Sequence, residues 1–304
     1  MILKTNDIFE CLRKRPKKKI VVISAEDPNI YEVVINAIEL GIAEFILIGD
    51  KNIIEKYEMD NRKDINIEIL NIKDHKNASE KGVSLIKEGK ADTIMKGLLH
   101  TSTFLKAVLD KEKGLNKGGL ISQISVFDKN DGNGLNLVTD CAMAIEPTLE
   151  QKISIIENAI ELANKLGYDN PKVALISAVE TVNPKIKDTL EAAILCKMAE
   201  RGQIKGAVLD GPLALDNAIS EEAAKSKGIE SKVAGRADIL IVPNLQVGNV
   251  LHKSLTYYAN KIVASAVMGA KVPIIMTSRT DSVKSKLLTI ALSCYISFKN
   301  DNCR

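Results

Sequence analysis

The chain contains no tryptophan and few aromatic residues of any kind. Aromatic side chains make up 4% of its 304 residues, and the formal net charge is only +3. Proteins that bind nucleic acids usually present a strongly basic face, and those that bind single strands stack bases on aromatic rings. We therefore expect no nucleic-acid partner. The densest basic run, residues 13–19, is interpreted as a solvated face, with a contact to the phosphates of a nucleotide-like ligand as the alternative.

Several short motifs with well-known chemistry are also missing. The sequence has no CxxC pair, no GxSxG nucleophile motif, no Walker motif and no GxGxxG. Its three histidines, His75, His100 and His252, are too scattered to suggest a metal site by spacing. We therefore expect no bound metal, no tightly bound cofactor and no covalent acyl-enzyme.

The cysteines and the apolar runs bear on the location of the protein. The five cysteines show no paired spacing, and the first residues lack the pattern of a signal peptide. This combination predicts reduced thiols in a cytoplasmic protein. No apolar run approaches the ~18 residues that a membrane span needs, so we expect no membrane partner.

The sequence does contain a regular alternation of short apolar runs with helical patterns. Such an alternation predicts βαβ units, a largely parallel sheet and an α/β fold. We expect strands at residues 19–24, 44–48, 67–72, 93–95, 173–177, 207–209, 239–242, 262–268 and 273–276. We expect helices at residues 30–40, 78–88, 103–109, 149–166, 189–201, 220–227, 247–258 and 283–298.

One segment departs from this alternation. Residues 121–127 and 135–139 are apolar runs separated by a stretch dense in Asn, Asp and Gly, which predicts a β-hairpin. We place a domain crossing there. Because no linker is present, the chain is expected to leave a first domain, build a second one and return. The expected division is 1–128 with 270–304 for the first α/β domain and 129–269 for the second.

The most informative stretch joins the last strand to the last helix. Residues 277–282, TSRTDS, place hydroxyls, one guanidinium and one carboxylate at this junction, before a helix with one apolar face. Ligands of open α/β sheets bind outside the carboxyl ends of strands, and helix starts attract anions. The planar fork of Arg279 fits a phosphate. The alternative is that Asp281 or Ser282 caps the helix while Arg279 lies on the surface.

Two other expected strand ends are followed by side chains that could bind a ligand, and a third, before Asp210, is less specific. After residues 93–95, Lys96 offers a cation, and Thr101 or Ser102 can cap the next helix; a capped helix with a surface lysine is the alternative. After residues 239–242, Asn249 and Lys253 stand four apart, so an amide and an ammonium can point together at a phosphate.

The remaining candidates are less specific. A plain surface lysine is the alternative for Lys253. Asp210 follows an expected strand and precedes Gly-Pro, so it is interpreted either as a base or as a turn residue. His252 is expected to be a packed or surface histidine and not a ligand.

Five stretches taken together carry a resemblance to a known family. They are GLLHTSTFLKAVLDKEKGL (97–115), TDCAMAIEPTLEQK (139–152), LDGPLALDNAISEEAA (209–224), AGRADILIVPNLQVGNVLHKSLTYYA (234–259) and MGAKVPIIMTSRTDS (268–282). In this order they resemble the phosphate acetyl/butyryltransferase family, most closely its butyryl branch, over nearly the whole chain. The blocks DGPLALD, GNVLHKS and TSRTDS are specific only in combination.

The resemblance implies both a fold and an activity. The implied fold has two three-layer α/β/α domains like those of isocitrate/isopropylmalate dehydrogenases, with the active site in the interdomain cleft, in a homo-oligomer of two or more chains. The implied activity converts butyryl-CoA plus phosphate into butyryl phosphate plus CoA, by direct transfer in a ternary complex. The partners would be acyl-CoA, as a substrate, and inorganic phosphate.

Three alternatives remain open beside this activity. One is the same chemistry with an acetyl or another short acyl group. The second is a metal- and NAD-dependent dehydrogenase on the related fold. The third is a non-catalytic CoA-binding or regulatory protein.

The resemblance also implies roles for particular residues. The Ser-Arg pair of the acetyl branch, which serves acyl transfer and phosphate binding, falls on Ser278 and Arg279. That branch has an acidic residue seven positions after the serine, where this chain has Ser285, so Asp281 is our substitute for the general base. The residues expected to bind phosphate or CoA are Lys253, Asn249, Lys96, His100, Thr101 and Asp210.

Two further positions depart from the family's pattern. Family members often have an arginine at the position of Lys106 and a histidine at that of Gln123. Either departure would weaken a contact with phosphate or CoA.

Overall fold

The protein is described by a computed structural model that covers residues 1–61 and 67–298. The chain forms two compact units. Of the described residues, unit 1 contains Met1–Thr5 and Leu120–Val263, and unit 2 contains residues 6–61, 67–119 and 264–298. The hairpin in which we placed the domain crossing lies within unit 1.

Unit 2 contains a doubly wound parallel arrangement of strands. The strand order is β3-β2-β1-β4-β11-β10, in which β10 is antiparallel to β11 and the other neighbours are parallel. The last four residues of β1 (Lys18–Ile23) are buried, as expected for a strand covered on both faces. The other strands are β2 (Ala43–Gly49), β3 (Glu68–Asn71), β4 (Thr93–Lys96), β10 (Ala264–Met268) and β11 (Ile274–Ile275).

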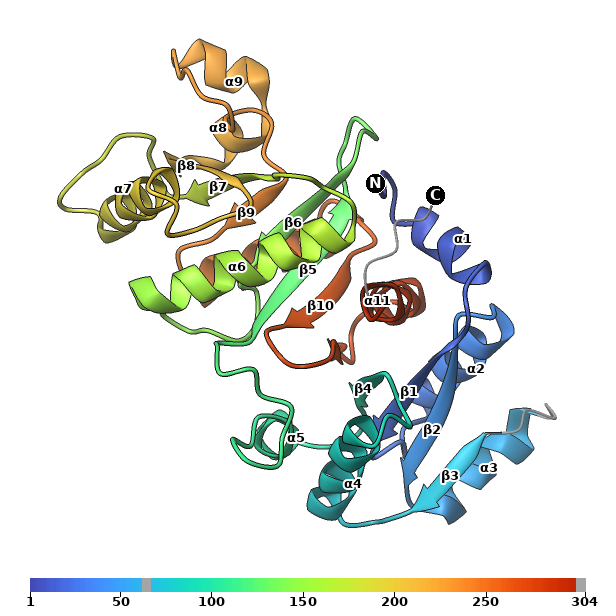
Figure 1. The fold of residues 1–304 in the computed structure, drawn as a ribbon. Helices are drawn as coiled ribbons and strands as arrows, with labels where there is room; N and C mark the ends of the chain where they lie inside the picture. The colour runs from blue at the N-terminus through green and yellow to red at the C-terminus, as the bar shows by residue number, and fades with distance from the viewer. Residues whose placement is uncertain (62–66, 299–304) are drawn as a thin grey trace. The chain divides into compact units, whose positions relative to one another are not determined.

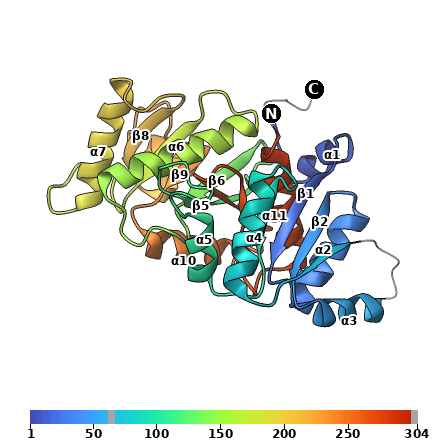
Figure 2. The same cartoon turned by 60° about the horizontal axis from the view of Figure 1, so that its bottom comes forward.

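Helices cover both faces of the unit 2 strands. In α2 (Pro28–Glu39), Pro28 fixes the first turn, and the Asp27 carboxylate accepts backbone N–H groups as the cap. α2 and α3 (Lys51–Asn61) lie on one face, and α4 (His75–Lys87) lies on the other, against α5 (Thr101–Val108) (Figures 1 and 2). α1 (Asp7–Arg13) packs against the last helix, α11 (Val283–Ile296).

Helix α11 is buried on nearly every side. The sequence predicts a single apolar face that includes Val283, but Val283 is exposed while the polar residues Lys286, Thr289 and Ser293 are buried. The reason is that α11 contacts two helices, α1 and α2, as well as strands β10 and β11. The Thr289 hydroxyl, for example, accepts the backbone N–H of Ser265 at 3.0 Å. The prediction of a one-sided amphipathic helix is therefore wrong.

Unit 1 starts its sheet with the hairpin that the sequence predicts. β5 (Ser122–Asp128) and β6 (Leu135–Thr139) are antiparallel neighbours. Three strands parallel to β6 follow in the order β9, β7, β8. They are β9 (Ile239–Ile241), β7 (Lys172–Ile176) and β8 (Val208–Leu213).

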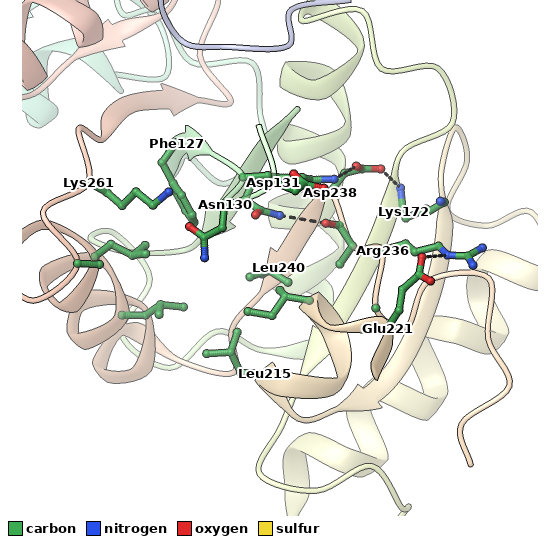
Figure 3. Close-up of a pocket in the computed structure, with 18 residues that line it drawn as sticks. Phe127, Asn130, Asp131, Lys172, Leu215, Glu221, Arg236, Asp238, Leu240 and Lys261 are labelled. Carbon is green, nitrogen blue, oxygen red and sulfur yellow. Dashed lines mark hydrogen bonds and ion pairs between the residues drawn. The ribbon is translucent and has the colours of Figure 1, made fainter. Parts of the chain in front are cut away.

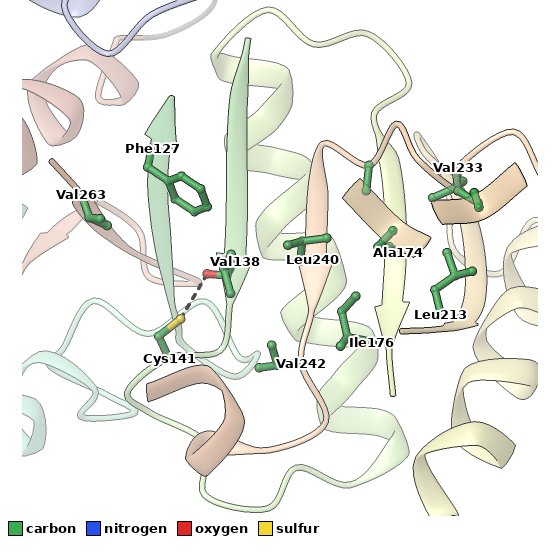
Figure 4. Close-up of a cluster of buried hydrophobic side chains, with 14 residues drawn as sticks. Phe127, Val138, Cys141, Ala174, Ile176, Leu213, Val233, Leu240, Val242 and Val263 are labelled. Carbon is green, nitrogen blue, oxygen red and sulfur yellow. Dashed lines mark hydrogen bonds between the residues drawn. The ribbon is translucent and has the colours of Figure 1, made fainter. Parts of the chain in front are cut away.

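The unit 1 strands are also covered on both sides. α6 (Leu149–Lys165) and α10 (Leu245–Tyr257) lie on opposite sides of β5 and β6 (Figure 2). α7 (Lys187–Glu200) packs beside α6, and α8 (Leu215–Ile219) contacts β7 and precedes α9 (Glu221–Ser226). Side chains of neighbouring strands, such as Val138, Leu240 and Ala174, form the core between these layers (Figure 4).

One ion pair of unit 1 is buried. Lys152 of α6 and Glu191 of α7 are 5% and 9% exposed, and their charged atoms are 2.6 Å apart. Burial alone would raise the pKa of Glu191, but the hydrogen bond and charge of Lys152 outweigh it and lower that pKa. The pair therefore links α6 to α7.

Three helices, α1, α3 and α8, were not predicted. α1 is a single short segment that buries two side chains, Ile8 and Leu12, which is too little periodicity to detect in sequence. α8 spans only five residues, Leu215–Ile219. Their formation depends on packing against the rest of the chain.

The cysteines only partly match the expectation. Cys141, Cys196 and Cys294 are free, and burial raises the pKa of each thiol to about 12. These three thiols are therefore un-ionised at neutral pH. Cys11 is disulfide-bonded, so the prediction that all five cysteines are reduced is wrong.

None of the helices among the described residues has the length and apolar character needed to cross a membrane.

Candidate active site

The carboxyl ends of the unit 2 strands meet at a point where the strand order reverses. From β1 the chain proceeds to β2 and β3 on one side and then to β4 on the other, so the switch point lies between β1 and β4. Open α/β sheets bind ligands outside the strands at such a point. Lys96 ends β4 there, and residues 276–282 follow the next strand, β11.

Backbone packing at the switch point is tight. The Gly97 N–H donates to the Ile23 carbonyl oxygen at 2.8 Å. A Cβ at Gly97 would lie 2.2 Å from the Ser24 carbonyl oxygen, so only glycine fits. Ser24 has a φ of 57°, and its buried hydroxyl hydrogen-bonds Nδ1 of His75 at 2.7 Å. These contacts fix the backbone that carries Lys96.

Lys96 and Arg279 are neighbouring cations, and among the described residues no carboxylate pairs with either. Lys96 Nζ donates to the carbonyl oxygens of Gly97 and Leu99, at 3.1 and 2.9 Å. The pKa of Lys96 is lowered from 10.5, first by burial and then by the charge of Arg279, against a smaller opposing effect of Asp27. Like charges repel unless an anion lies between them. The pair is therefore suited to a dianion such as phosphate.

Helix α5 starts beside Lys96 without a side-chain cap. Its N-cap residue is His100, whose side chain makes no capping hydrogen bond, so the prediction that Thr101 or Ser102 caps the helix is wrong. Within the described residues, the backbone N–H groups of Thr101, Ser102 and Thr103 have no acceptor. Free N–H groups at the positive end of a helix attract anions. Lys96 donates hydrogen bonds to the loop that leads into this helix, so its ammonium lies next to the start of α5.

The loop between β11 and α11 is closed by its own polar side chains. The Asp281 carboxylate accepts the N–H of Ser278 at 2.7 Å, and the Ser278 and Thr280 hydroxyls are 3.0 Å apart. Ser282 caps α11 by accepting a backbone N–H at 3.1 Å. Ser278 and Arg279 are exposed. Asp281 thus orders the turn that presents both side chains, while its role as general base stays a prediction.

Helix α10 carries the candidates of unit 1. It starts after β9, where the Asn244 side chain caps it. Asn249 is exposed and Lys253 is half-buried, one helical turn further on. His252 is buried and its Nδ1 lies 2.8 Å from the Ser125 hydroxyl, which confirms the expectation of a packed histidine.

A buried carboxylate at the end of β6 was not recognised from the sequence. Asp140 is 3% exposed, and burial raises its pKa although four backbone N–H groups oppose this effect. Gly248 of α10 passes so close that a Cβ there would lie 2.1 Å from the Asp140 carbonyl oxygen. Asp140 thus orders the loop beneath the first turns of α10. Its four N–H donors are Gln123, Ala142, Met143 and Ala144.

Asp210 lies inside a strand and not at a strand end. We expected the strand to stop at residue 209, but β8 continues through Pro212 to Leu213, and Asp210 pairs with Ala174 of β7. Its carboxylate accepts the N–H of Gly211 at 2.8 Å. The predicted position is therefore wrong, and a contact with phosphate or CoA stays a prediction.

Comparison with known proteins places the chain in a family. The profile of the family described as "Phosphate acetyl/butaryl transferase" matches residues 3–81 and 57–294. A phosphate butyryltransferase of Clostridium acetobutylicum is 44% identical over 297 residues, which cover 97% of this chain and 99% of that protein. The chain belongs to the phosphate acetyl/butyryltransferase family.

Solved structures agree with the fold of this transferase family. A branched-chain phosphotransacylase from Enterococcus faecalis is 32% identical with a TM-score of 0.82, covering 93% of this chain and 100% of that one. A 4-hydroxythreonine-4-phosphate dehydrogenase from Klebsiella pneumoniae is 13% identical with a TM-score of 0.59, over 93% of this chain and 100% of that one. The second likeness concerns the fold alone. The expected α/β fold is confirmed, whereas the likeness to isocitrate/isopropylmalate dehydrogenases stays a prediction.

Ser285 stands where the resemblance implies an acidic residue in the acetyl branch. Ser285 is buried there, and its hydroxyl accepts a hydrogen bond from Ser282 at 3.2 Å. Nor do the described residues contain a group of three or more His, Cys, Asp or Glu able to hold a metal ion.

The structure brings some of the sequence-predicted residues together and separates others. In unit 2 it places Lys96, next to the start of α5, near Arg279. In unit 1 it places Asn249 and Lys253 on one helix. Asp210 lies on β8, at the far end of the unit 1 strand order from the hairpin.

Proposed function

We propose that the chain transfers a short acyl group between CoA and inorganic phosphate: butyryl-CoA plus phosphate gives butyryl phosphate plus CoA. The observation that carries this proposal is the pair of cations, Lys96 and Arg279, beside the uncapped start of α5. The 44% identity to a phosphate butyryltransferase supports the choice of acyl group. An acetyl or another short acyl group is the alternative within the family, and a kinetic series of acyl-CoA chain lengths distinguishes them.

Phosphate binding is the first requirement of this reaction. The guanidinium of Arg279 offers a planar pair of donors, and Lys96 offers a point charge. The free N–H groups at the start of α5 supply further donors. Each charge-assisted hydrogen bond contributes roughly 1.5–3 kcal/mol, so phosphate relieves the repulsion between the two cations and gains several bonds.

Acyl transfer then needs no covalent intermediate on the protein. A phosphate oxygen attacks the thioester carbonyl, the carbon–sulfur bond breaks, and the proton of hydrogen phosphate passes to the departing thiolate. The Ser278 hydroxyl donates to the developing oxyanion or to the sulfur, a role worth on the order of 3 kcal/mol. Orientation of the two substrates supplies about 7–11 kcal/mol, so positioning is the larger effect.

We also propose that both units contribute to one active site, in the cleft that the resemblance implies, and that the chain forms a homo-oligomer. In each unit the candidate side chains follow the carboxyl ends of parallel strands, which supports a shared role. Asn249 and Lys253 would then contact the phosphate or the CoA held by Arg279. Size-exclusion chromatography with light scattering tests the oligomer.

The first test measures thiol release from butyryl-CoA with and without phosphate. We expect release to require phosphate, and Arg279→Gln to raise the KM for phosphate about 10- to 100-fold, because one or two charge-assisted bonds are lost. Arg201→Gln is the matched control, since Arg201 is exposed on the end of α7. An Arg279→Gln enzyme with the wild-type KM for phosphate would refute the assignment.

The same experiment separates the rival functions. A non-catalytic CoA-binding protein would bind CoA in a calorimeter without releasing thiol from any acyl-CoA. A dehydrogenase would bind NAD, and its activity would depend on a divalent metal.

A further inference from the structure

A cavity lies in unit 1, at the strand ends opposite to those that carry its candidate residues. Its volume is about 470 Å³, within the usual range for a small-molecule site of ~300–1,000 Å³ (Figure 3). The lining includes Asn136 near the start of β6, Asp238 just before β9 and Lys172 at the start of β7. Asn249 and Asp140, by contrast, belong to the other edge of these parallel strands. The cavity is therefore separate from the proposed catalytic residues of this unit.

Part of the cavity lining is apolar. Phe127 and Leu240 belong to the buried core of unit 1, and Leu251 and Leu255 of α10 pack against that core while only partly buried. Leu215 of α8 also lines the cavity (Figure 3) and is 36% exposed. A ligand with an apolar body gains free energy here, because it removes this surface from water.

The acidic side chains of the rim are already engaged. Asp238 accepts from Lys129 Nζ at 2.7 Å, and its other oxygen accepts a backbone N–H. Glu221 accepts from Arg236 Nε at 2.6 Å (Figure 3). The third acid, Asp131, is exposed and accepts a backbone N–H at 3.0 Å. Lys129 and Arg236 of the lining are therefore paired with carboxylates.

Among the described residues, neither Lys172 nor Lys261 of the lining forms a direct ion pair with a carboxylate, although the charge of Lys172 helps to lower the pKa of Glu221. Lys261 is half-buried, and its Nζ donates to one carbonyl oxygen, that of Asp128, at 3.1 Å. Two of its three N–H groups thus remain available. Asn130 contributes its amide to the same lining (Figure 3). An ammonium and an amide in a partly apolar lining suit an anionic head with an apolar tail.

We propose that this cavity binds a small amphipathic anion, with a carboxylate or phosphate head on an aliphatic tail. The head lies against Lys261 and Asn130, and the tail lies on Leu240 and Leu255. The proposal stands on the unit 1 cavity alone and does not depend on the acyl-transfer activity.

The test is calorimetry on the full chain with three probes: hexanoate, hexyl phosphate and hexan-1-ol. We expect one molecule of an anionic probe to bind per chain, and hexan-1-ol to bind at least several-fold more weakly. Lys261→Met should weaken the anion by about tenfold or more, since it removes a charge-assisted bond. Lys232→Met is the matched control, because Lys232 is an exposed lysine of the same unit outside the lining, and it should bind as the wild type does.

A second variant keeps the test independent of Lys261. Leu215→Trp places a larger side chain in the lining and should abolish binding of the tail, while circular dichroism confirms that each variant is folded. Arg279→Gln should leave the binding that depends on Lys261 unchanged, because Arg279 belongs to the proposed phosphate site of unit 2.

Each outcome decides the proposal. Binding of hexanoate alone identifies a carboxylate head, binding of hexyl phosphate alone identifies a phosphate head, and binding of both means that either head is accepted. The proposal is overturned if hexan-1-ol binds as well as the anions, or if wild type binds no probe at millimolar concentration. It is also overturned if Arg279→Gln abolishes binding while Lys261→Met preserves it.

Discussion

The charged ammonium of Lys96 is destabilised both by burial and by the neighbouring charge of Arg279. Burial removes water from the ammonium, and the guanidinium of Arg279 repels it. Most lysines of this chain lie on the surface, and several pair with carboxylates. A cation kept in an unfavourable position is a common feature of binding sites, because the ligand supplies the missing charge.

The lowered pKa of Lys96 leads to a prediction about pH. Phosphate binding needs the charged ammonium, so affinity is full below the pKa of Lys96 and falls as the pH rises through that value, which lies below 10.5. Lys96→Arg keeps its charge in this range and should lose the alkaline decline. Lys96→Met should bind phosphate about tenfold or more weakly at neutral pH.

Calorimetric titration of phosphate across the alkaline range checks this prediction. Parallel pH profiles for the wild type and Lys96→Met would show that this ammonium does not contact phosphate.

The residues of the candidate site differ in how far the sequence predicts them. Ser278 and Arg279 follow from a polar hexapeptide at a strand–helix junction, since that junction is local in the chain. The pairing of Lys96 with Arg279 joins positions far apart in sequence, so only the sheet order brings them together. The burial of Asp140 was missed for the same reason, because its donors come partly from a neighbouring strand.

At the scale of elements, packing changed what local pattern predicted. The apolar periodicity of α11 indicates one buried face, but the helix is enclosed by two helices and two strands, and its polar residues are buried as well. β8 extends through a Gly-Pro pair that reads as a turn. It lies at the end of the unit 1 strand order. A proline, which has no backbone N–H, is tolerated on such an edge strand because the strand need not donate hydrogen bonds to neighbours on both sides.

The buried ion pair between α6 and α7 leads to a prediction about stability. Glu191→Gln should destabilise the fold by about 3–5 kcal/mol, because it leaves the buried ammonium of Lys152 without its partner. Glu157→Gln, on the exposed side of α6, should cost much less. Replacing both members, Lys152→Met with Glu191→Leu, should restore stability close to that of the wild type.

Urea unfolding at neutral and acidic pH measures these effects. The folded pKa of Glu191 is lowered below 4.5, so its contribution is present above the unfolded value and is lost as the pH falls through the folded value. The free energy of unfolding of Glu191→Gln should therefore fall less on acidification than that of the wild type. Equal effects of Glu191→Gln and Glu157→Gln would contradict the prediction.

At the scale of the whole molecule, the chain divides its candidate residues between two units. Arg279 and Lys96 belong to unit 2, whereas Asn249 and Lys253 belong to unit 1. Each set lies where parallel strands end, so each unit repeats the same arrangement of strand ends and helix starts. A reaction between two substrates can use such a division, with phosphate and acyl-CoA held by different groups.

A double-mutant cycle tests whether the two units act on one reaction. Arg279→Gln, Lys253→Ala and their combination should change kcat/KM non-additively, with a coupling of about 0.5–3 kcal/mol, if both side chains contact the same substrates. The pair Arg279→Gln with Arg201→Gln is the control and should be additive. Additivity of the Arg279 and Lys253 effects would contradict a shared site.

The sequence by itself determined the alternating strands and helices, the hairpin, the family and the hexapeptide that presents Ser278 and Arg279. These features depend on neighbours in the chain, where propensity, periodicity and turn chemistry act directly. Only the tertiary structure decided which cations meet, which helix start stays uncapped, and where a partly apolar cavity lined by Lys261 opens. Those properties arise from burial and from charges brought close by the strand order, and residues distant in sequence create them.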